Sequence, residues 1–153
     1  MGNGSGRTGA WPDGAPVVGQ RASLSRTMRP EYIELFSEIS GDYNPVHYDE
    51  AVAAASPFGE IILQGGVTSS ILNAVVAQEL PGPGSVFLQL DLTFRASVRP
   101  GDVITGTVEV TSVRDDKPIT ELDVSVTRDD GVVALSGHAV CFTAPGSPRI
   151  DPS

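Results

Sequence analysis

The chain has 153 residues and a formal net charge of −9, with 40% hydrophobic and 19% charged residues. This length and balance predict one globular domain with a full core. The negative charge argues against a nucleic-acid surface, which needs clustered Lys and Arg, and against docking to an anionic membrane. We therefore expect neither nucleic acid nor a membrane as a partner.

Cys141 is the only cysteine, so an internal disulfide cannot form. A reducing cytoplasm fits this usage. The sequence has no apolar run long enough for a transmembrane helix, and its N-terminus lacks the apolar core of a signal peptide. We expect a cytoplasmic protein, with Cys141 as a small buried hydrophobic residue rather than a nucleophile.

The two ends differ in composition from the rest. Residues 1–16 are rich in Gly, Ser and Pro, which predicts a flexible N-terminal tail in which only Trp11 is suited to pack on the body. Residues 145–153 contain three prolines and predict a flexible C-terminal tail. A single domain is expected over residues 17–144.

The first half of the sequence predicts one strand, two helices and a turn. Residues 20–28 alternate and predict a strand, and Pro30 then suits a first helical turn. Apolar residues follow at helical spacing up to a break at Gly41, and an Ala-rich turn is expected over residues 49–55. Residues 66–80 predict the principal helix, which is apolar on most sides and therefore buried.

The period changes to two from Ser85 onward. Three sets of alternating apolar residues predict strands: Val86, Leu88, Leu90, Leu92 and Phe94; Ile104, Val108 and Val110; Leu122, Val124 and Val126. A last strand is expected over residues 132–143. Asp130-Gly131 favours a hairpin turn, and residues 115–118 mark another turn. A sheet with one apolar face must cover something, so we predict an α+β arrangement, a curved antiparallel sheet wrapped around one long central helix: a hot-dog fold.

The segment Ser40-Gly41-Asp42-Tyr43-Asn44-Pro45-Val46-His47 carries the clearest chemical signal. Pro45 pushes Asn44 out of the helical region, so the segment is irregular and Asp42 and His47 can be aimed at one water. The alternative is an Asx-type turn in which His47 is merely nearby. A metal site of Asp42, His47 and Asp49 lacks a supporting Cys or His cluster, so we predict no metal.

The stretch Phe58-Gly59-Glu60-Ile61-Ile62-Leu63-Gln64-Gly65-Gly66 leads into the principal helix. Amides at a helix start lack internal partners and carry partial positive charge. Since Gly65 and Gly66 have no side chains in the way, a carbonyl oxygen that gains negative charge could bind there. The alternative is that the glycines only permit a tight turn and close packing.

Together the two motifs resemble the MaoC-like (R)-specific enoyl-CoA hydratases, the hydratase 2 family, in its short single-hot-dog form. Residues 40–47 are similar to the signature segment of that family, and Phe58-Gly59 and Gln64-Gly65 to the segment before its central helix. Leu80-Pro81-Gly82 with Gly84-Ser85 is similar to the helix exit, and Asp116-Lys117-Pro118 to a later loop. The resemblance covers residues 20–142.

The resemblance implies that Asp42 and His47 are the catalytic pair, that Asn44 shapes their loop, and that the N–H of Gly65 binds the thioester oxygen. Water would add reversibly to a trans-2-enoyl thioester, giving the (R)-3-hydroxyacyl product. His47 would activate the water and Asp42 would handle the proton at C2, although a coupled pair does not by itself reveal this division. No cofactor is implied beyond coenzyme A as part of the substrate.

The chain departs from the family at three positions. Gln64 stands where members usually have His, Gly66 where a large apolar residue is frequent, and Asn73 where some carry a small hydroxyl residue. With Asn44, we expect these residues to contact the substrate and to influence rate and substrate shape.

The partners expected from the resemblance are an acyl-CoA and a second copy of the chain in a homodimer. An acyl carrier protein is disfavoured by like-charge repulsion. Two other functions stay open, a hot-dog acyl-CoA thioesterase and a non-catalytic acyl-CoA-binding protein. His138 is interpreted as a surface or partly buried strand residue.

Overall fold

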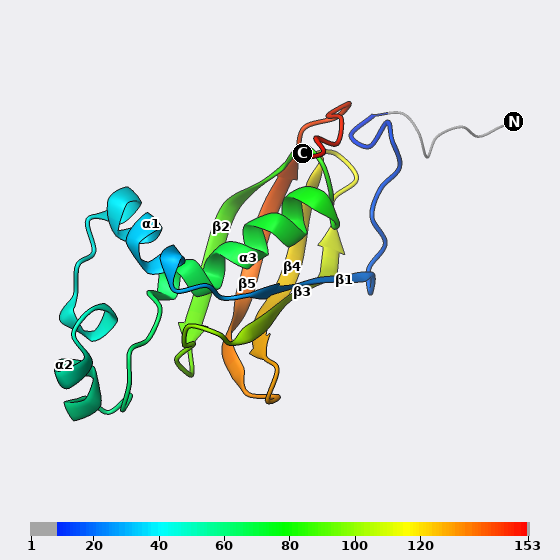
Figure 1. Ribbon diagram of the computed structural model, residues 1–153. Coiled ribbons are helices and arrows are strands. Elements are labelled where there is room, and N and C mark those ends of the chain that lie inside the picture. Colours follow the sequence, from blue (N-terminus) through cyan, green and yellow to red (C-terminus); the bar gives the residue numbers. More distant parts are fainter. Residues whose placement is uncertain (1–8, 153) are drawn as a thin grey trace, which may run out of the picture.

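The structure, a computed structural model, describes residues 9–152. Its elements are β1 (Arg21–Thr27), α1 (Glu31–Ser40), the 3₁₀ turn η2 (Pro45–His47), α2 (Glu50–Ala55), α3 (Gly65–Gln78), β2 (Ser85–Phe94), β3 (Val103–Val113), β4 (Ile119–Arg128) and β5 (Val133–Thr143). The strands form one antiparallel sheet in the order β1-β3-β4-β5-β2. Helix α3 lies along one face of the curved sheet, and α1 and α2 lie to one side of it (Figure 1). This arrangement is the predicted α+β hot-dog fold.

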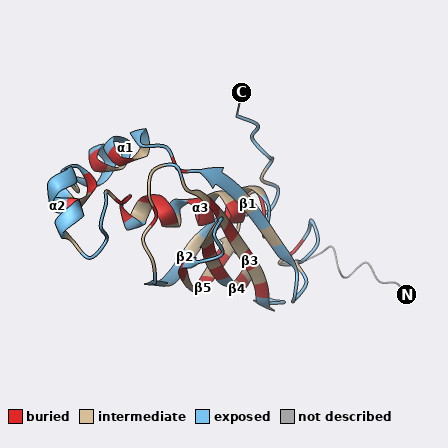
Figure 2. Cartoon of the chain, turned by 60° about the horizontal axis from the view of Figure 1, so that its bottom comes forward, coloured by how far each residue is buried: buried red, intermediate tan, exposed pale blue. Residues whose placement is uncertain are grey.

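The core lies between α3 and the middle strands, where buried residues concentrate (Figure 2). Its fully buried side chains include Leu72 on α3, Ile104 on β3 and Leu122 on β4. The helix approaches β3 closely at Gly106, where a Cβ atom would lie 2.8 Å from Cγ2 of Ile71. The alternation predicted for β3 and β4 is confirmed, since it places their apolar side chains under the helix.

Strand β2 differs from its predicted pattern. Simple alternation placed Val86 on the same face as Leu90, but the register with β5 shifts between Phe87 and Gln89. Phe87 lies opposite Cys141, whose side chain is buried. Val86 lies opposite Phe142, the residue after Cys141, so its side chain points to the opposite face of the sheet from that of Phe87. The expectation of one continuous apolar face was wrong because a bulge inserts an extra residue.

The segment between α1 and α3 is more helical than expected. Residues 50–55 form the short helix α2 rather than a turn, because the Asp49 carboxylate accepts hydrogen bonds from the amides of Ala51 and Val52. Pro30 is the N-cap of α1 rather than part of its first turn. The predicted stripe of α1 is only partly buried, since Ile39 is 81% exposed.

The described parts of the two ends contact the body at Trp11 and one another at Gly146. Trp11 is 9% exposed, and its Nε1 donates a hydrogen bond of 2.7 Å to the carbonyl of Arg114. The amide of Gly146 donates to the Asp13 carboxylate at 3.1 Å. Trp11 therefore packs as the sequence suggested, while the flexibility of the two tails and the domain limits stay predictions.

Burial raises the pKa of the Cys141 thiol to about 12. The thiolate is therefore scarce at neutral pH, which fits a buried hydrophobic residue and not a nucleophile. Within residues 9–152, none of the helices has the length and apolar character needed to cross a membrane.

Candidate active site

Helix α1 ends where the candidate catalytic loop begins. Gly41 adopts a left-handed conformation with φ of 78°, and its amide donates to the carbonyl of Ser37. A glycine takes this conformation without the steric cost that a Cβ atom brings. The chain thereby turns away from the helix axis, and Asp42 leaves the helix with its carboxylate free to face the following loop.

The predicted Asx-type turns form within this loop. The amide of Asn44 donates to Oδ1 of Asp42 at 3.0 Å, and the amide of Val46 donates to the side-chain oxygen of Asn44 at 3.4 Å. Pro45 then opens the 3₁₀ turn that carries His47. The Asx interpretation and the dyad interpretation are therefore compatible, because Asp42 uses only one of its two oxygens in the turn.

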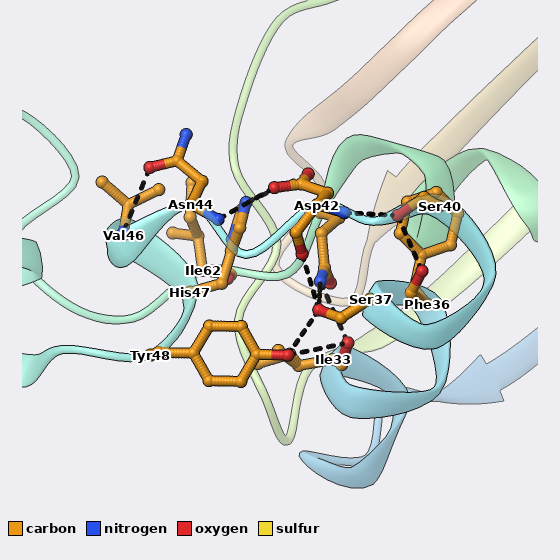
Figure 3. Close-up of polar contacts among 11 residues, drawn as sticks. Ile33, Phe36, Ser37, Ser40, Asp42, Asn44, Val46, His47, Tyr48 and Ile62 are labelled. Carbon is orange, nitrogen blue, oxygen red and sulfur yellow. Dashed lines mark hydrogen bonds and ion pairs between the residues drawn. The ribbon is translucent and has the colours of Figure 1, made fainter.

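His47 is held in one orientation beside Asp42 (Figure 3). Its ring is 7% exposed, and Nδ1 lies 2.7 Å from the carbonyl oxygen of Ile62. A carbonyl only accepts hydrogen bonds, so Nδ1 carries the proton and the neutral ring has its lone pair on Nε2. Nε2 lies 3.8 Å from the free oxygen, Oδ2, of Asp42.

This geometry brings two proton acceptors to one point. With neutral His47 and ionised Asp42, both facing atoms accept hydrogen bonds, so they do not bond directly to one another at 3.8 Å. A group with two protons, such as a water molecule, can donate to both at once. The pair is therefore arranged to hold one water between a basic nitrogen and a carboxylate.

Gly65 is the first residue of α3, and its amide belongs to the turn that has no intrahelical acceptor. It borders a cavity of about 350 Å³ that is also lined by Phe58, Ile62 and Phe94. Ile62 connects this cavity with the dyad, because its carbonyl holds His47. A Cβ atom on Gly65 would lie only 2.8 Å from the ring of Phe94. A glycine is therefore needed for the present approach of this ring to the helix start.

The other predicted site residues lie in three different surroundings. Gln64 is 1% exposed, and its amide bonds with α1. Gly66 lies under the ring of Phe36, where a Cβ atom would come within 2.1 Å of Cζ. Asn73 is exposed on α3 and borders a separate cavity of about 330 Å³, with Val76 and Phe87. The structure thus brings Asp42, Asn44 and His47 together, and the substrate contacts of the remaining three stay predictions.

Several contributors to the site were not expected from the sequence. These are Ser37 and Tyr48, which contact one another, and the carbonyl of Ile62 that holds His47. Ser37 gave one signal in the sequence, since it is a polar residue four positions after Ile33 and so shares its side of α1. In the structure both residues are buried. A backbone carbonyl gives no such signal, because every residue has one.

The Asp49 carboxylate caps α2 through Oδ1. Across the described part of the chain, no group of three or more His, Cys, Asp and Glu side chains is arranged to hold a metal ion.

Fold and site together define a hot-dog protein with an Asp–His pair beside the start of its central helix. A family model described as "MaoC like domain" matches residues 15–132. The chain belongs to this MaoC-like family.

Individual relatives agree with that assignment. The (R)-specific enoyl-CoA hydratase of Aeromonas caviae is 39% identical over 123 residues, which are 80% of this chain and 92% of the relative. The 3-hydroxybutyryl-CoA dehydratase of Methylorubrum extorquens is 36% identical over 135 residues, or 88% and 85% of the two chains. The solved structure of the (R)-hydratase from A. caviae involved in PHA biosynthesis superposes with a TM-score of 0.80 at 37% identity, covering 84% of this chain and 98% of that one.

Proposed function

We propose that this protein is an (R)-specific enoyl-CoA hydratase, a hydro-lyase that reversibly adds water to trans-2-enoyl thioesters. The observation that carries the proposal is the orientation of His47. Its Nδ1–H is committed to the Ile62 carbonyl, which leaves the Nε2 lone pair 3.8 Å from the Asp42 carboxylate. A base and an acid so placed serve the two proton transfers of a hydration.

In the proposed mechanism the pair exchanges protons with one water and one carbon. Neutral His47 takes a proton from the water through Nε2 while the hydroxide adds to C3 of the substrate. Nε2 of His47 passes this proton to Oδ2 of Asp42, which delivers it to C2. This restores neutral His47 and ionised Asp42, and dehydration follows the same steps in reverse.

The start of α3 would stabilise the charge that develops during this addition. Electron density moves from the double bond onto the thioester oxygen, which then resembles an enolate. The free N–H of Gly65, with the partial positive charge of the helix start, is suited to donate to that oxygen. Coenzyme A enters only as part of the substrate, since hydration changes no oxidation state overall and no cofactor is needed.

We propose an acyl-CoA rather than an acyl carrier protein as the natural substrate. The net charge of −9 disfavours an acidic carrier through like-charge repulsion. Asn73, Gln64 and Gly66 are proposed to shape the substrate site, and the cavity beside Asn73 is a candidate for part of the acyl chain. A cytoplasmic location stays the expectation.

We propose that two copies of the chain form a homodimer through β2. This strand pairs with β5 on one side and forms an edge of the sheet on the other. Large apolar side chains are exposed along it, at Val86, Leu88, Leu90 and Phe94. A long apolar edge of this kind is a site for strand pairing. Light scattering at micromolar concentration should give twice the mass of the chain, and a monomeric mass would refute this assembly.

A single experiment tests the proposed reaction. The protein is mixed with crotonyl-CoA, and the enoyl absorbance and the free thiol are followed together. We expect the absorbance to fall while the thiol stays masked, with the (R)-3-hydroxy product formed. Release of free thiol would identify a thioesterase instead, and binding without either change would identify a non-catalytic acyl-CoA-binding protein.

A further inference from the structure

A small polar cluster, buried at two of its three residues, connects the dyad loop with the start of α3, and Figure 3 shows its Ser37 and Tyr48. It consists of Ser37 on α1, Tyr48 after the 3₁₀ turn, and Gln64, the residue before Gly65. Ser37 and Gln64 are each 1% exposed. A buried polar cluster among apolar neighbours weakens the fold unless its hydrogen bonds are made, so each bond in it matters.

The orientation of the Gln64 amide follows from its partners. Nε2 donates to the carbonyl of Ile33 at 3.0 Å and to Oγ of Ser37 at 3.1 Å. Because the carbonyl only accepts, the nitrogen must face it, and both of its protons are used. Oε1 of Gln64 is buried and has no hydrogen-bond partner among the described residues. Gln64 therefore supplies two donors at the cost of a buried acceptor that the fold leaves unsatisfied.

The hydroxyl of Ser37 passes this connection on to Asp42. It donates to the backbone carbonyl of Asp42 at 2.6 Å. It then has two acceptor positions. One receives a single Nε2 proton of Gln64, and the other faces the hydroxyl of Tyr48, which also lies 3.5 Å from the carbonyl of Ile33. All three hydrogen-bonding positions of Ser37 are therefore used, and its side chain has one defined orientation.

We propose that Gln64 and Ser37 are positioning residues that fix Asp42 relative to Gly65. The chain of bonds runs from Gln64, adjacent to Gly65, through Ser37 to the backbone of Asp42. It thereby joins the acid of the dyad to the donor for the thioester oxygen, two groups 23 positions apart in sequence. The inference rests on the proposed function for its effect on rate, but the bonds themselves can be tested without it.

Gln64→Met is the decisive variant, because it keeps the length of the side chain and removes both donors and the unsatisfied oxygen. Loss of the two hydrogen bonds lowers stability, whereas loss of the unsatisfied oxygen raises it, so these effects should offset and leave the melting temperature nearly unchanged. We expect kcat to fall about 10-fold or more through misplacement of Asp42, and KM for crotonyl-CoA to change much less than kcat. Gln64→His restores an N–H donor and should recover most of the loss.

A double-mutant cycle separates positioning of Asp42 from general damage. If Gln64 acts through Asp42, then Gln64→Met should have little further effect in an Asp42→Asn background. An equal loss in both backgrounds would overturn the proposal. Thr120→Val is the matched control, since Thr120 is also buried with an unpartnered oxygen but lies near the turn between β3 and β4. It should leave kcat unchanged.

Amide hydrogen exchange gives a readout that does not depend on activity. The amides of Asn44 and His47 are bonded within the dyad loop, to the Asp42 carboxylate and the Asn44 carbonyl. Gln64→Met should accelerate their exchange at least several-fold and leave the amides of β4 unchanged. Unaltered exchange in the loop would refute the connection. If the wild type fails to hydrate crotonyl-CoA while this exchange result holds, the proposed function fails and the positioning contact stands.

Discussion

The sheet with α3 and the segment over residues 31–64 are held in place by different forces. In the first region, the contacts are apolar, between buried side chains such as Leu72, Val108 and Leu122. In the second, side-chain hydrogen bonds set the chain path at Asp42, Asn44 and Gln64. Burial supplies free energy without direction, whereas hydrogen bonds fix angles and distances. Substitutions in the sheet should therefore change stability, and substitutions in the segment should change rate.

The largest effect on rate is expected at the dyad. Asp42→Asn keeps the shape of the side chain but removes its proton-exchanging carboxylate, and His47→Gln keeps polarity but cannot exchange a proton near neutral pH. Each change should lower kcat for crotonyl-CoA hydration on the order of 100-fold or more. The double variant should be little worse than the worse single variant, since the two groups act as a unit.

This prediction needs a control for folding and for binding. Circular dichroism should show both variants folded, and the affinity for acyl-CoA should change far less than kcat. Near-normal hydration by both variants would mean that Asp42 forms only its turn and that His47 lies beside it without a catalytic role.

Gly65, the first residue of α3 and the neighbour of that segment, tests the proposed oxyanion donor. Gly65→Pro removes the N–H at the first helical position, where proline is well tolerated. Loss of one such donor should raise the barrier by about 3 kcal/mol. Gly65→Ala is the matched control, because it adds a Cβ against Phe94 but keeps the N–H. If the two variants lose the same activity, the contact of the added Cβ with the Phe94 ring explains the loss, and the missing N–H does not.

Leu122→Ala is the corresponding test of the sheet. Leu122 is fully buried on β4 within the main core. Its truncation should lower the free energy of unfolding by about 3 kcal/mol, measured by urea denaturation. At a temperature where the variant is still folded, kcat should stay within about twofold of the wild type. A larger loss of rate would mean that the apolar core also determines the geometry of the site.

The same contrast explains how much could be predicted from the sequence. The alternation of β3 and β4 and the apolar helix α3 follow from burial, which leaves a period in the sequence. Burial is also why the hot-dog fold could be predicted. The bulge in β2 could not, because the pattern of Val86, Leu88 and Leu90 is equally regular with or without an extra residue.

The site could be predicted only as far as its local motifs reach. Asp42, Asn44 and His47 lie within six residues, and Pro45 restricts the chain between them. The partner of His47 is a backbone carbonyl 15 residues away, and the partners of Gln64 are 27 and 31 residues away. These contacts depend on tertiary packing, so neither spacing nor residue type indicates them.

Trp11 also makes a long-range contact, which joins the N-terminal end of the chain to the sheet region. Its indole donates to the carbonyl of Arg114, 103 positions away. Trp11→Ala should lower the free energy of unfolding by about 2 kcal/mol, less than for an aromatic residue in a closed core. Trp11→Phe removes the hydrogen bond and keeps a ring, and should cost about 1 kcal/mol. Both should hydrate crotonyl-CoA normally, and a rate defect without a stability defect would contradict the separation of the two regions.

The smallest expected effect lies on the outer face of the sheet, at His138. Its ring contacts Glu121 at 3.3 Å and Asp123 at 3.4 Å on β4, and Asp91 is its register partner on β2. Glu121 above all, with Asp123, raises the pKa of His138 above its usual 6.5, although partial burial opposes this. Because the pKa is raised in the folded state, the stabilisation is fully present below pH 6.5 and is lost as the pH rises through the raised value.

A pH series compares the wild type with His138→Gln in this respect. The variant should be less stable at pH 6 by under about 1 kcal/mol, because the pair is largely exposed and screened. The difference should vanish at pH 9, where His138 is neutral in both states, and it should shrink in high salt. Hydration of crotonyl-CoA should be unaffected at either pH, since His138 lies on the sheet and outside the segment that orients the dyad. A stability difference that grows with pH would contradict the stabilising contact of charged His138 with Glu121 and Asp123. A loss of rate would indicate that His138 affects the active site.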